Sequence, residues 1–208
     1  MSIARTRIRV AFVGRLIELK RVRLLIEAIS GLASQNVELA IIGTGPLEGE
    51  LRTMAEALLP GRVLWIGVLP IEEVPKHMAQ ADCLVLPSRH DGWGAVVSEA
   101  LMVGTPAICS DRCGAAGVVL ASRRGGVFPS GDVGALTTQL QRIVDGGRQS
   151  WQQRAELADW AKCLGAEAGA TYLTEILRYV ETGGARPAPP WEGAGSARDQ
   201  TSIGSLLS

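Results

Sequence analysis

The chain has 208 residues, of which 47% are hydrophobic and 20% are charged, so it holds enough apolar material for one buried core or two small ones. Lysine plus arginine and aspartate plus glutamate number 21 each, so no net charge favours nucleic acid or an anionic membrane as a partner. The apolar run near the N-terminus ends by Val13 and is too short for a signal-peptide core or a membrane span. We therefore expect a soluble, cytoplasmic protein with no membrane span, and peripheral association with a membrane stays open.

Short strand-like segments alternate with longer helical ones. The expected strands are Arg7–Val13, Val37–Ile42, Val63–Ile66, Cys83–Leu86, Pro106–Cys109 and Gly126–Phe128. The expected helices are Val22–Leu32, Leu47–Leu59, Ile71–Gln80, Gly94–Met102 and one that begins after Asp132 as its N-cap. Strands rich in valine, isoleucine and leucine on both faces, each followed by a helix, predict an α/β fold with a doubly wound parallel sheet, and ligands of such sheets bind outside the carboxyl ends of the strands.

The C-terminal part changes in character. Residues 151–180 have helical spacing of apolar residues, with a break into two helices predicted near Gly165 and Gly169. Residues 182–208 are rich in glycine, proline and serine, which predicts a disordered tail in which Trp191 is the one residue suited to anchor a partner. We therefore expect one domain over residues 1–181.

The cysteines and histidines do not form a metal-binding pattern. The cysteines are Cys83, Cys109, Cys113 and Cys163, and the histidines are His77 and His90. No Cys-x-x-Cys occurs, whereas a zinc site normally takes four well-placed nitrogen or sulfur ligands. Reduced cysteines and no bound metal are the expectation.

The first expected strand runs into the loop Gly14-Arg-Leu-Ile-Glu-Leu-Lys-Arg21. Gly14 permits a sharp turn and the close approach of a ligand. Arg15 and Lys20 place two cations near the carboxyl end of a strand, which suits a diphosphate. By itself the pattern is more typical of a solvated basic turn.

The second expected strand is followed by Gly43-Thr-Gly-Pro46. This is not the dinucleotide fingerprint, because Pro46 replaces its continuation and the third glycine is missing. A ligand loop and a simple tight turn before a helix both remain open.

The fourth strand leads into Asp91-Gly-Trp-Gly94 and then a helix carrying Glu99. The first amide groups of that helix, at Gly94, Ala95, Val96 and Val97, lack partners one turn earlier and together with the helix dipole favour an anion. Alone, Asp91 also fits a turn residue and Glu99 a solvated helix face.

Two basic residues lie beside these loops. His90 directly precedes Asp91, and Arg112 lies in the loop after the fifth strand. Each fits either a contact with sugar or phosphate or an ordinary exposed side chain.

The order of these motifs resembles the donor half of family 4 glycosyltransferases, in which two acidic residues are separated by seven others. Here the pair is Asp91 and Glu99, with aspartate in place of the usual first glutamate. The family's first loop reads Gly-Arg-Leu and then Lys-Gly, and in this chain Arg21 replaces that second glycine.

The resemblance implies roles for individual residues. Arg15 and Lys20 would hold the phosphates of a nucleotide-sugar, Asp91 would orient the transferred sugar, and these three form the expected catalytic set. Glu99 would accept hydrogen bonds from the ribose. The remaining expected contacts with the donor are made by Gly14, Gly67, Val68, Gly94, Ala95, Val96 and Val97, of which Gly67 and Val68 would meet the base. The resemblance implies no cofactor and no metal.

The resemblance covers residues 8–181 and implies the C-terminal, Rossmann-like half of a GT-B fold. The function it implies is a retaining glycosyltransferase whose acceptor is held by another domain or subunit, packed against an apolar face of the C-terminal helices. A non-catalytic module that binds a nucleotide-sugar or a protein is the alternative. A sugar-nucleotide epimerase would need catalytic groups on a second, facing domain.

Overall fold

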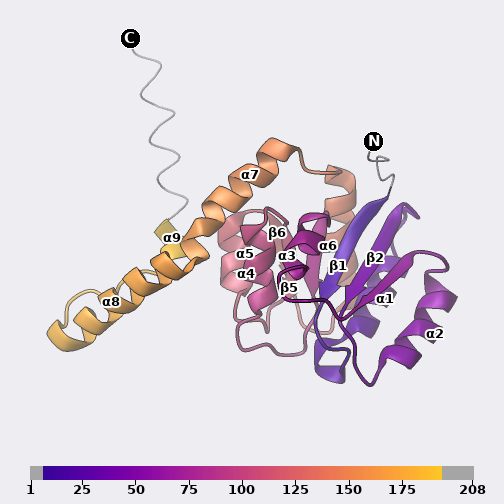
Figure 1. The fold of residues 1–208 in the computed structure, drawn as a ribbon, viewed down its shortest axis with the longest axis horizontal. Helices are drawn as coiled ribbons and strands as arrows, with labels where there is room; N and C mark the ends of the chain where they lie inside the picture. Colours follow the sequence, from indigo (N-terminus) through magenta and orange to yellow (C-terminus); the bar gives the residue numbers. More distant parts are fainter. Residues whose placement is uncertain (1–6, 194–208) are drawn as a thin grey trace, which may run out of the picture.

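A computed structural model describes residues 7–193 as an open α/β sheet with helices on both faces (Figure 1). The strands are β1 (Ile8–Val13), β2 (Val37–Ile42), β3 (Val63–Gly67), β4 (Cys83–Leu86), β5 (Ala107–Ser110) and β6 (Gly125–Phe128). The α-helices are α1 (Val22–Ser30), α2 (Glu48–Leu58), α3 (Val74–Ala79), α4 (Ala95–Met102), α5 (Ala116–Ser122), α6 (Val133–Gly146), α7 (Trp151–Trp160), α8 (Ala166–Thr182) and α9 (Pro190–Gly193). Two short 3-10 helices, η1 (Glu18–Lys20) and η2 (Ala161–Leu164), lie between them.

The six strands are parallel and lie in the order β3-β2-β1-β4-β5-β6. The sheet grows in one direction from β1 to β3 and in the other from β4 to β6, so its topological switch lies between β1 and β4. These two strands pair with Val10 opposite Cys83 and Ala11 opposite Leu84. In open α/β sheets the crevice outside the carboxyl ends at such a switch is the usual place for a ligand.

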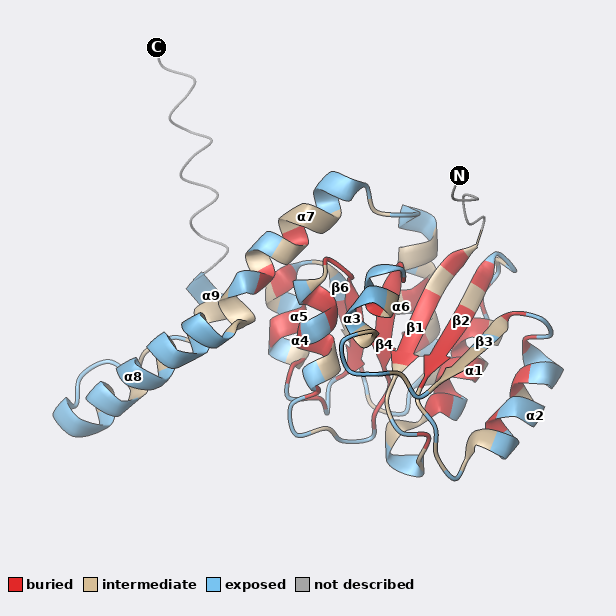
Figure 2. Ribbon diagram, viewed as in Figure 1, coloured by how far each residue is buried: buried red, intermediate tan, exposed pale blue. Residues whose placement is uncertain are grey.

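Two apolar layers hold the helices to the sheet (Figure 2). One face of the sheet packs on α1, α2 and α6, with Leu25 and Leu136 fully buried between them. The other packs on α3, α4, α5 and α7, with Leu101 and Leu157 buried. Burying one such side chain contributes about 1.5–3 kcal/mol, so the central strands, buried on both faces, anchor the loops at their ends.

The predicted doubly wound parallel sheet is confirmed, and each of the six predicted strands is present within one residue at either end. Asp132 caps α6 as expected, because its Oδ1 accepts a hydrogen bond of 2.8 Å from the Ala135 amide. The helix α5 was not predicted. Its first turn, between Ala116 and Val119, follows a glycine- and alanine-rich loop, and tertiary packing of Val118 and Val119 compensates for the weak local signal.

The C-terminal segments extend beyond the sheet. The break predicted near Gly165 and Gly169 is at Gly165, and α8 projects away from the body of the domain with none of its residues buried (Figures 1 and 2). The sequence predicts a disordered tail that begins at residue 182. In the structure Thr182 is the last residue of α8, and Pro190–Gly193 forms the short helix α9, so the prediction is wrong for these residues. The rest of the expected tail, residues 194–208, lies outside the described residues. Over residues 7–193, no helix has the length and apolar character that crossing a membrane requires.

The turn after β2 passes very close to the turn after β1. The Gly43 amide donates to the Gly67 carbonyl at 2.7 Å, and the backbone at Gly43 has φ 126°. A Cβ atom at this position would overlap the Gly14 carbonyl. A Cβ atom at Gly45 would likewise overlap the backbone of Leu16. The Gly-x-Gly of this loop is thus explained by the close approach of two loop backbones.

We expect Gly43→Ala to lower the free energy of unfolding by at least about 2 kcal/mol, because the left-handed backbone and the overlap with Gly14 both oppose a side chain. Gly49→Ala is the matched control, since Gly49 lies in helix α2 with open space around it and should gain up to about 1 kcal/mol. Urea unfolding of both variants measures the difference. Equal stabilities would show that the two turns do not pack as described.

Candidate functional site

The loops after β1 and β4 meet at the switch point of the sheet. The Lys20 ammonium donates to Asp91 Oδ2 at 2.5 Å, across 71 positions of sequence. Both side chains are largely sheltered, with 23% and 15% of their surfaces exposed. The Ser88 hydroxyl lies 3.5 Å from the same carboxylate oxygen. Asp91 Oδ1 has no hydrogen-bond partner within residues 7–193, so it can accept from a ligand hydroxyl.

Backbone contacts fix the loop that carries Asp91. Its amide donates to the Arg112 carbonyl at 3.0 Å and its carbonyl accepts from the Gly114 amide at 3.1 Å, so the loop after β5 holds it on one side. A side chain at Gly114 would overlap the Gly92 carbonyl. On the other side, the Arg89 amide donates to the Leu19 carbonyl at 2.8 Å and ties this loop to the one after β1. The carboxylate is therefore placed by three loops together.

The predicted cations are differently placed. Lys20 ends the short helix η1 and faces Asp91, whereas the Arg15 side chain is exposed and makes no ion pair or hydrogen bond with the other described residues. The loop that carries both cations begins at Gly14, whose amide donates to the Ile42 carbonyl at 3.0 Å. The structure brings Lys20 into the site directly and leaves Arg15 free at its edge.

The helix α4 begins at this same edge of the sheet. Gly94 precedes it with φ 85°, and a side chain there would overlap Cys113 and Leu86. The amides of Ala95 and Val96 have no acceptor in the described structure, as expected for a helix start. Val97 differs from the expectation, because its amide donates to the Gly94 carbonyl at 2.8 Å and its side chain is buried in the core. The Gly94 amide likewise has no acceptor among residues 7–193, so three of the four expected amides remain for an anion.

The exposed residues of α4 open onto a hollow of about 320 Å³. Ala95 and Glu99 line it together with Trp93 and Trp191. The two indole rings lie 5.6 Å apart at 53°, and Trp93 Nε1 donates to Ser98 Oγ at 3.2 Å. Trp191 therefore lies against this protein's own Trp93, a contact that composition alone did not reveal because the two residues are almost a hundred positions apart.

The expected base contacts lie farther along the edge. Gly67 ends β3 with φ 79°, and Val68 follows with 72% of its surface exposed. Two strands, β2 and β1, separate β3 from the switch point. Val68 is open to solvent, as contact with a nucleotide base would require, whereas the Gly67 carbonyl already accepts from the Gly43 amide.

The cysteines have ordinary structural surroundings. All four are free, and burial raises the pKa of the Cys83 thiol. The pKa of the Cys109 thiol is also raised, first by the side-chain hydrogen bond between Cys109 and Cys113 and then by burial. Among residues 7–193 no three histidine, cysteine or acidic side chains gather in a way that could hold a metal ion. These thiols contribute to packing in the described structure.

Comparison of the sequence with models of known protein families gives a further finding. Residues 2–159 match the model described as "Glycosyl transferases group 1". The chain belongs to this family.

The group 1 glycosyltransferases most similar in sequence are longer proteins. The chain is 33% identical over 148 residues to the amylovoran biosynthesis glycosyltransferase AmsK of Erwinia amylovora, covering 67% of this chain and 36% of that protein. It is 31% identical over 162 residues to the GDP-mannose-dependent alpha-(1-6)-phosphatidylinositol monomannoside mannosyltransferase of Mycolicibacterium smegmatis, covering 73% and 42%. The chain thus spans less than half the length of these relatives.

Solved structures show the same architecture. HepE of Anabaena, in complex with UDP, superposes with a TM-score of 0.72 at 20% identity, over 83% of this chain and 49% of that one. The lipopolysaccharide outer core galactosyltransferase WaaB gives 0.66 at 23% identity, over 76% and 45%. These likenesses establish the fold, a single Rossmann-like half of the GT-B architecture.

We expect Asp91→Asn to lower the free energy of unfolding of this glycosyltransferase domain by about 1–2 kcal/mol, because a sheltered ammonium loses its charged acceptor. Lys76→Gln removes the matched exposed pair with Glu73, 2.6 Å apart, and should cost less than about 0.5 kcal/mol. Urea unfolding of the two variants makes the comparison. Similar losses would mean that the Lys20–Asp91 pair is no better sheltered than a surface pair.

Proposed function

We propose that this chain is the donor-binding, C-terminal half of a retaining, family 4 type glycosyltransferase that uses a nucleotide-sugar. The observation that supports it most is the meeting of Lys20 and Asp91 at the switch of the sheet, beside the free amides at the start of α4. This arrangement offers positive charge to a diphosphate and a carboxylate to a sugar hydroxyl at one place.

The chemistry follows from where charge develops. When the bond between the anomeric carbon and the phosphate oxygen breaks, negative charge builds up on the departing nucleoside diphosphate. Lys20, the exposed Arg15 and the amides of Ala95 and Val96 would stabilise that charge, which makes a metal unnecessary in this proposal. Lys20 retains two N–H donors besides the one given to Asp91.

The remaining residues would position the donor. Asp91, through its free Oδ1, would hold a sugar hydroxyl, with a reach about one methylene shorter than that of the family's glutamate. Glu99, on the exposed side of α4, would accept from the ribose hydroxyls. The Gly67 and Val68 backbone would meet the base, and Gly14 allows the loop after β1 to approach the phosphates.

Acceptor binding would come from a second domain or subunit, since the curated relatives are more than twice as long as the matched region. A surface for it is present on α8, where Leu173, Leu177 and Val180 are 58%, 60% and 73% exposed. Such an apolar face is typical of a helix that packs on another domain. The cytoplasmic location and the domain limits expected from the sequence stay predictions.

The donor site is tested by calorimetric titration of the chain with UDP-, GDP- and ADP-sugars. One donor should bind, and Lys20→Ala and Glu99→Ala should each weaken it about tenfold, equivalent to about 1.4 kcal/mol, because each removes one charged contact. Lys76→Ala, an exposed cation far from the site, is the control and should bind as the parent does. Failure of all donors to bind, with the chain folded by circular dichroism, would contradict the proposal. Binding without sugar transfer when a full-length relative's acceptor half is supplied would favour the non-catalytic module.

The surface on α8 is tested separately. Replacing Leu173 and Leu177 together by aspartate should change the free energy of unfolding of the isolated chain by less than about 0.5 kcal/mol, since both are exposed. Leu157→Asp, at a position 2% exposed, should cost at least about 3 kcal/mol. Urea unfolding measures both. A large loss in the α8 variant would show that its apolar face is already packed within the chain.

A further inference from the structure

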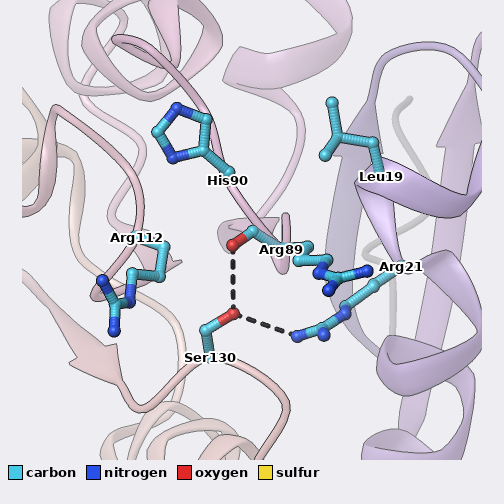
Figure 3. Close-up of a pocket in the computed structure, with 6 residues that line it drawn as sticks. All are labelled: Leu19, Arg21, Arg89, His90, Arg112 and Ser130. Carbon is cyan, nitrogen blue, oxygen red and sulfur yellow. Dashed lines mark hydrogen bonds between the residues drawn. The ribbon is translucent and has the colours of Figure 1, made fainter.

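A second hollow, of about 570 Å³, lies at the carboxyl edge of the sheet on the side of α1 and α6 (Figure 3). It is formed by the loops after β1, β4, β5 and β6. Its lining residues are Leu19, Arg21, Arg89, His90, Arg112 and Ser130. Arg21 directly precedes α1, and the turn of Ser130 leads into α6. Since α4 packs on the opposite face of the sheet, this hollow is separate from the hollow beside Glu99.

The lining of this hollow is basic. Three guanidinium groups and an imidazole border it, and no carboxylate does. Two acids adjoin lining residues in sequence, and both have partners: Asp111 Oδ1 accepts from the Ser130 amide at 2.8 Å, and Asp91 is paired with Lys20. The side chains of Arg89 and Arg112 have no hydrogen-bond or ion-pair partner among residues 7–193. Several cations gathered without a counter-charge repel one another, and a bound anion would relieve that repulsion.

Arg21 is held in a costly backbone conformation to reach this hollow. Its φ is 50° and its ψ 43°, a left-handed conformation that is unfavourable for a residue other than glycine. This is the position at which the resemblance led us to expect glycine. The strain is thus specific to this chain's arginine, and strained backbone is typically retained where a side chain has a use.

The guanidinium of Arg21 is also fixed in place. Its Nη1 donates to Ser130 Oγ at 3.0 Å, and that hydroxyl donates to the Arg89 carbonyl at 3.3 Å (Figure 3). The guanidinium lies against Gly131, where a Cβ atom would come within 3.1 Å of Nη1. One nitrogen is therefore anchored, and the other donors remain available for a ligand.

We propose that this hollow binds the phosphate group of an anionic ligand, beside the place assigned to the donor diphosphate and through a different set of side chains. Guanidinium groups match phosphate oxygens in pairs, and the half-exposed Leu19 supplies an apolar wall for the group that carries the phosphate. The relation of this site to the donor site rests on the proposed function, whereas its affinity for phosphate does not.

Calorimetric titration with glycerol 3-phosphate tests the site, with glycerol as the uncharged control. The decisive variant is Arg21→Gly, which should leave the melting temperature unchanged or higher, because backbone strain is relieved, and yet weaken binding at least fivefold. Arg112→Ala, at an exposed position, should weaken it similarly. Lys20→Ala should weaken this affinity less than either arginine variant, because Lys20 faces Asp91 and does not line the hollow.

Flotation with phosphatidylcholine vesicles, with and without phosphatidic acid, identifies the source of the phosphate. Binding to glycerol 3-phosphate, or binding only to the phosphatidic acid vesicles, supports the site in either case if Arg21→Gly and Arg112→Ala weaken it. Binding that survives both variants, binding lost only in Lys20→Ala, or no binding to either probe would overturn the proposal. Nucleotide-sugar titrations run in parallel are independent, so failure of the donor site and failure of this site are told apart.

Discussion

The pairing of β1 with β4 is the constraint on which the rest of the site depends. These strands are far apart in sequence, yet their adjacency places the loop of Lys20 next to the loop of Asp91. Both strands are buried on their two faces, so the free energy of the core fixes their register and with it the positions of the loops. A sheltered ion pair of 2.5 Å can form because the scaffold brings the ammonium and the carboxylate together before any ligand is involved.

Close backbone packing then shapes the loops around that pair. Gly43 allows the turns after β1 and β2 to pass each other, and Gly114 lets the loop after β5 support the one that carries Asp91. Gly94 has a different role, since its positive φ starts α4 against Cys113. Gly43 and Gly114 do not contact a ligand in our proposal. They set the distances at which side chains and amides can do so.

The carboxyl edge is divided by charge into two regions. On the side of α4, a hollow is lined by tryptophans, one acidic residue and free helix amides. On the side of α1 and α6, the second hollow is lined by guanidinium groups with no carboxylate. The chain has equal numbers of acidic and basic residues, yet basic side chains gather at one place on its surface, which composition cannot reveal.

The sequence by itself determined the alternation of strands and helices and the parallel sheet, because these follow from local hydrophobic periodicity, and the parallel sheet in turn predicts the edge at which a ligand would bind. It also indicated Lys20, Asp91 and the start of α4, since each belongs to a segment that connects a strand to the next helix. Only the tertiary structure decided that Lys20 pairs with Asp91 while Arg15 stays exposed, that the Val97 amide is already used, and that Trp191 packs on Trp93. It alone showed that Arg21, a mere departure from a glycine in the sequence, points into a basic hollow with Arg89 and Arg112. These contacts join residues dozens of positions apart, and their geometry is set by which strands are neighbours and how closely the loop backbones pack, neither of which is encoded in any local window of the chain.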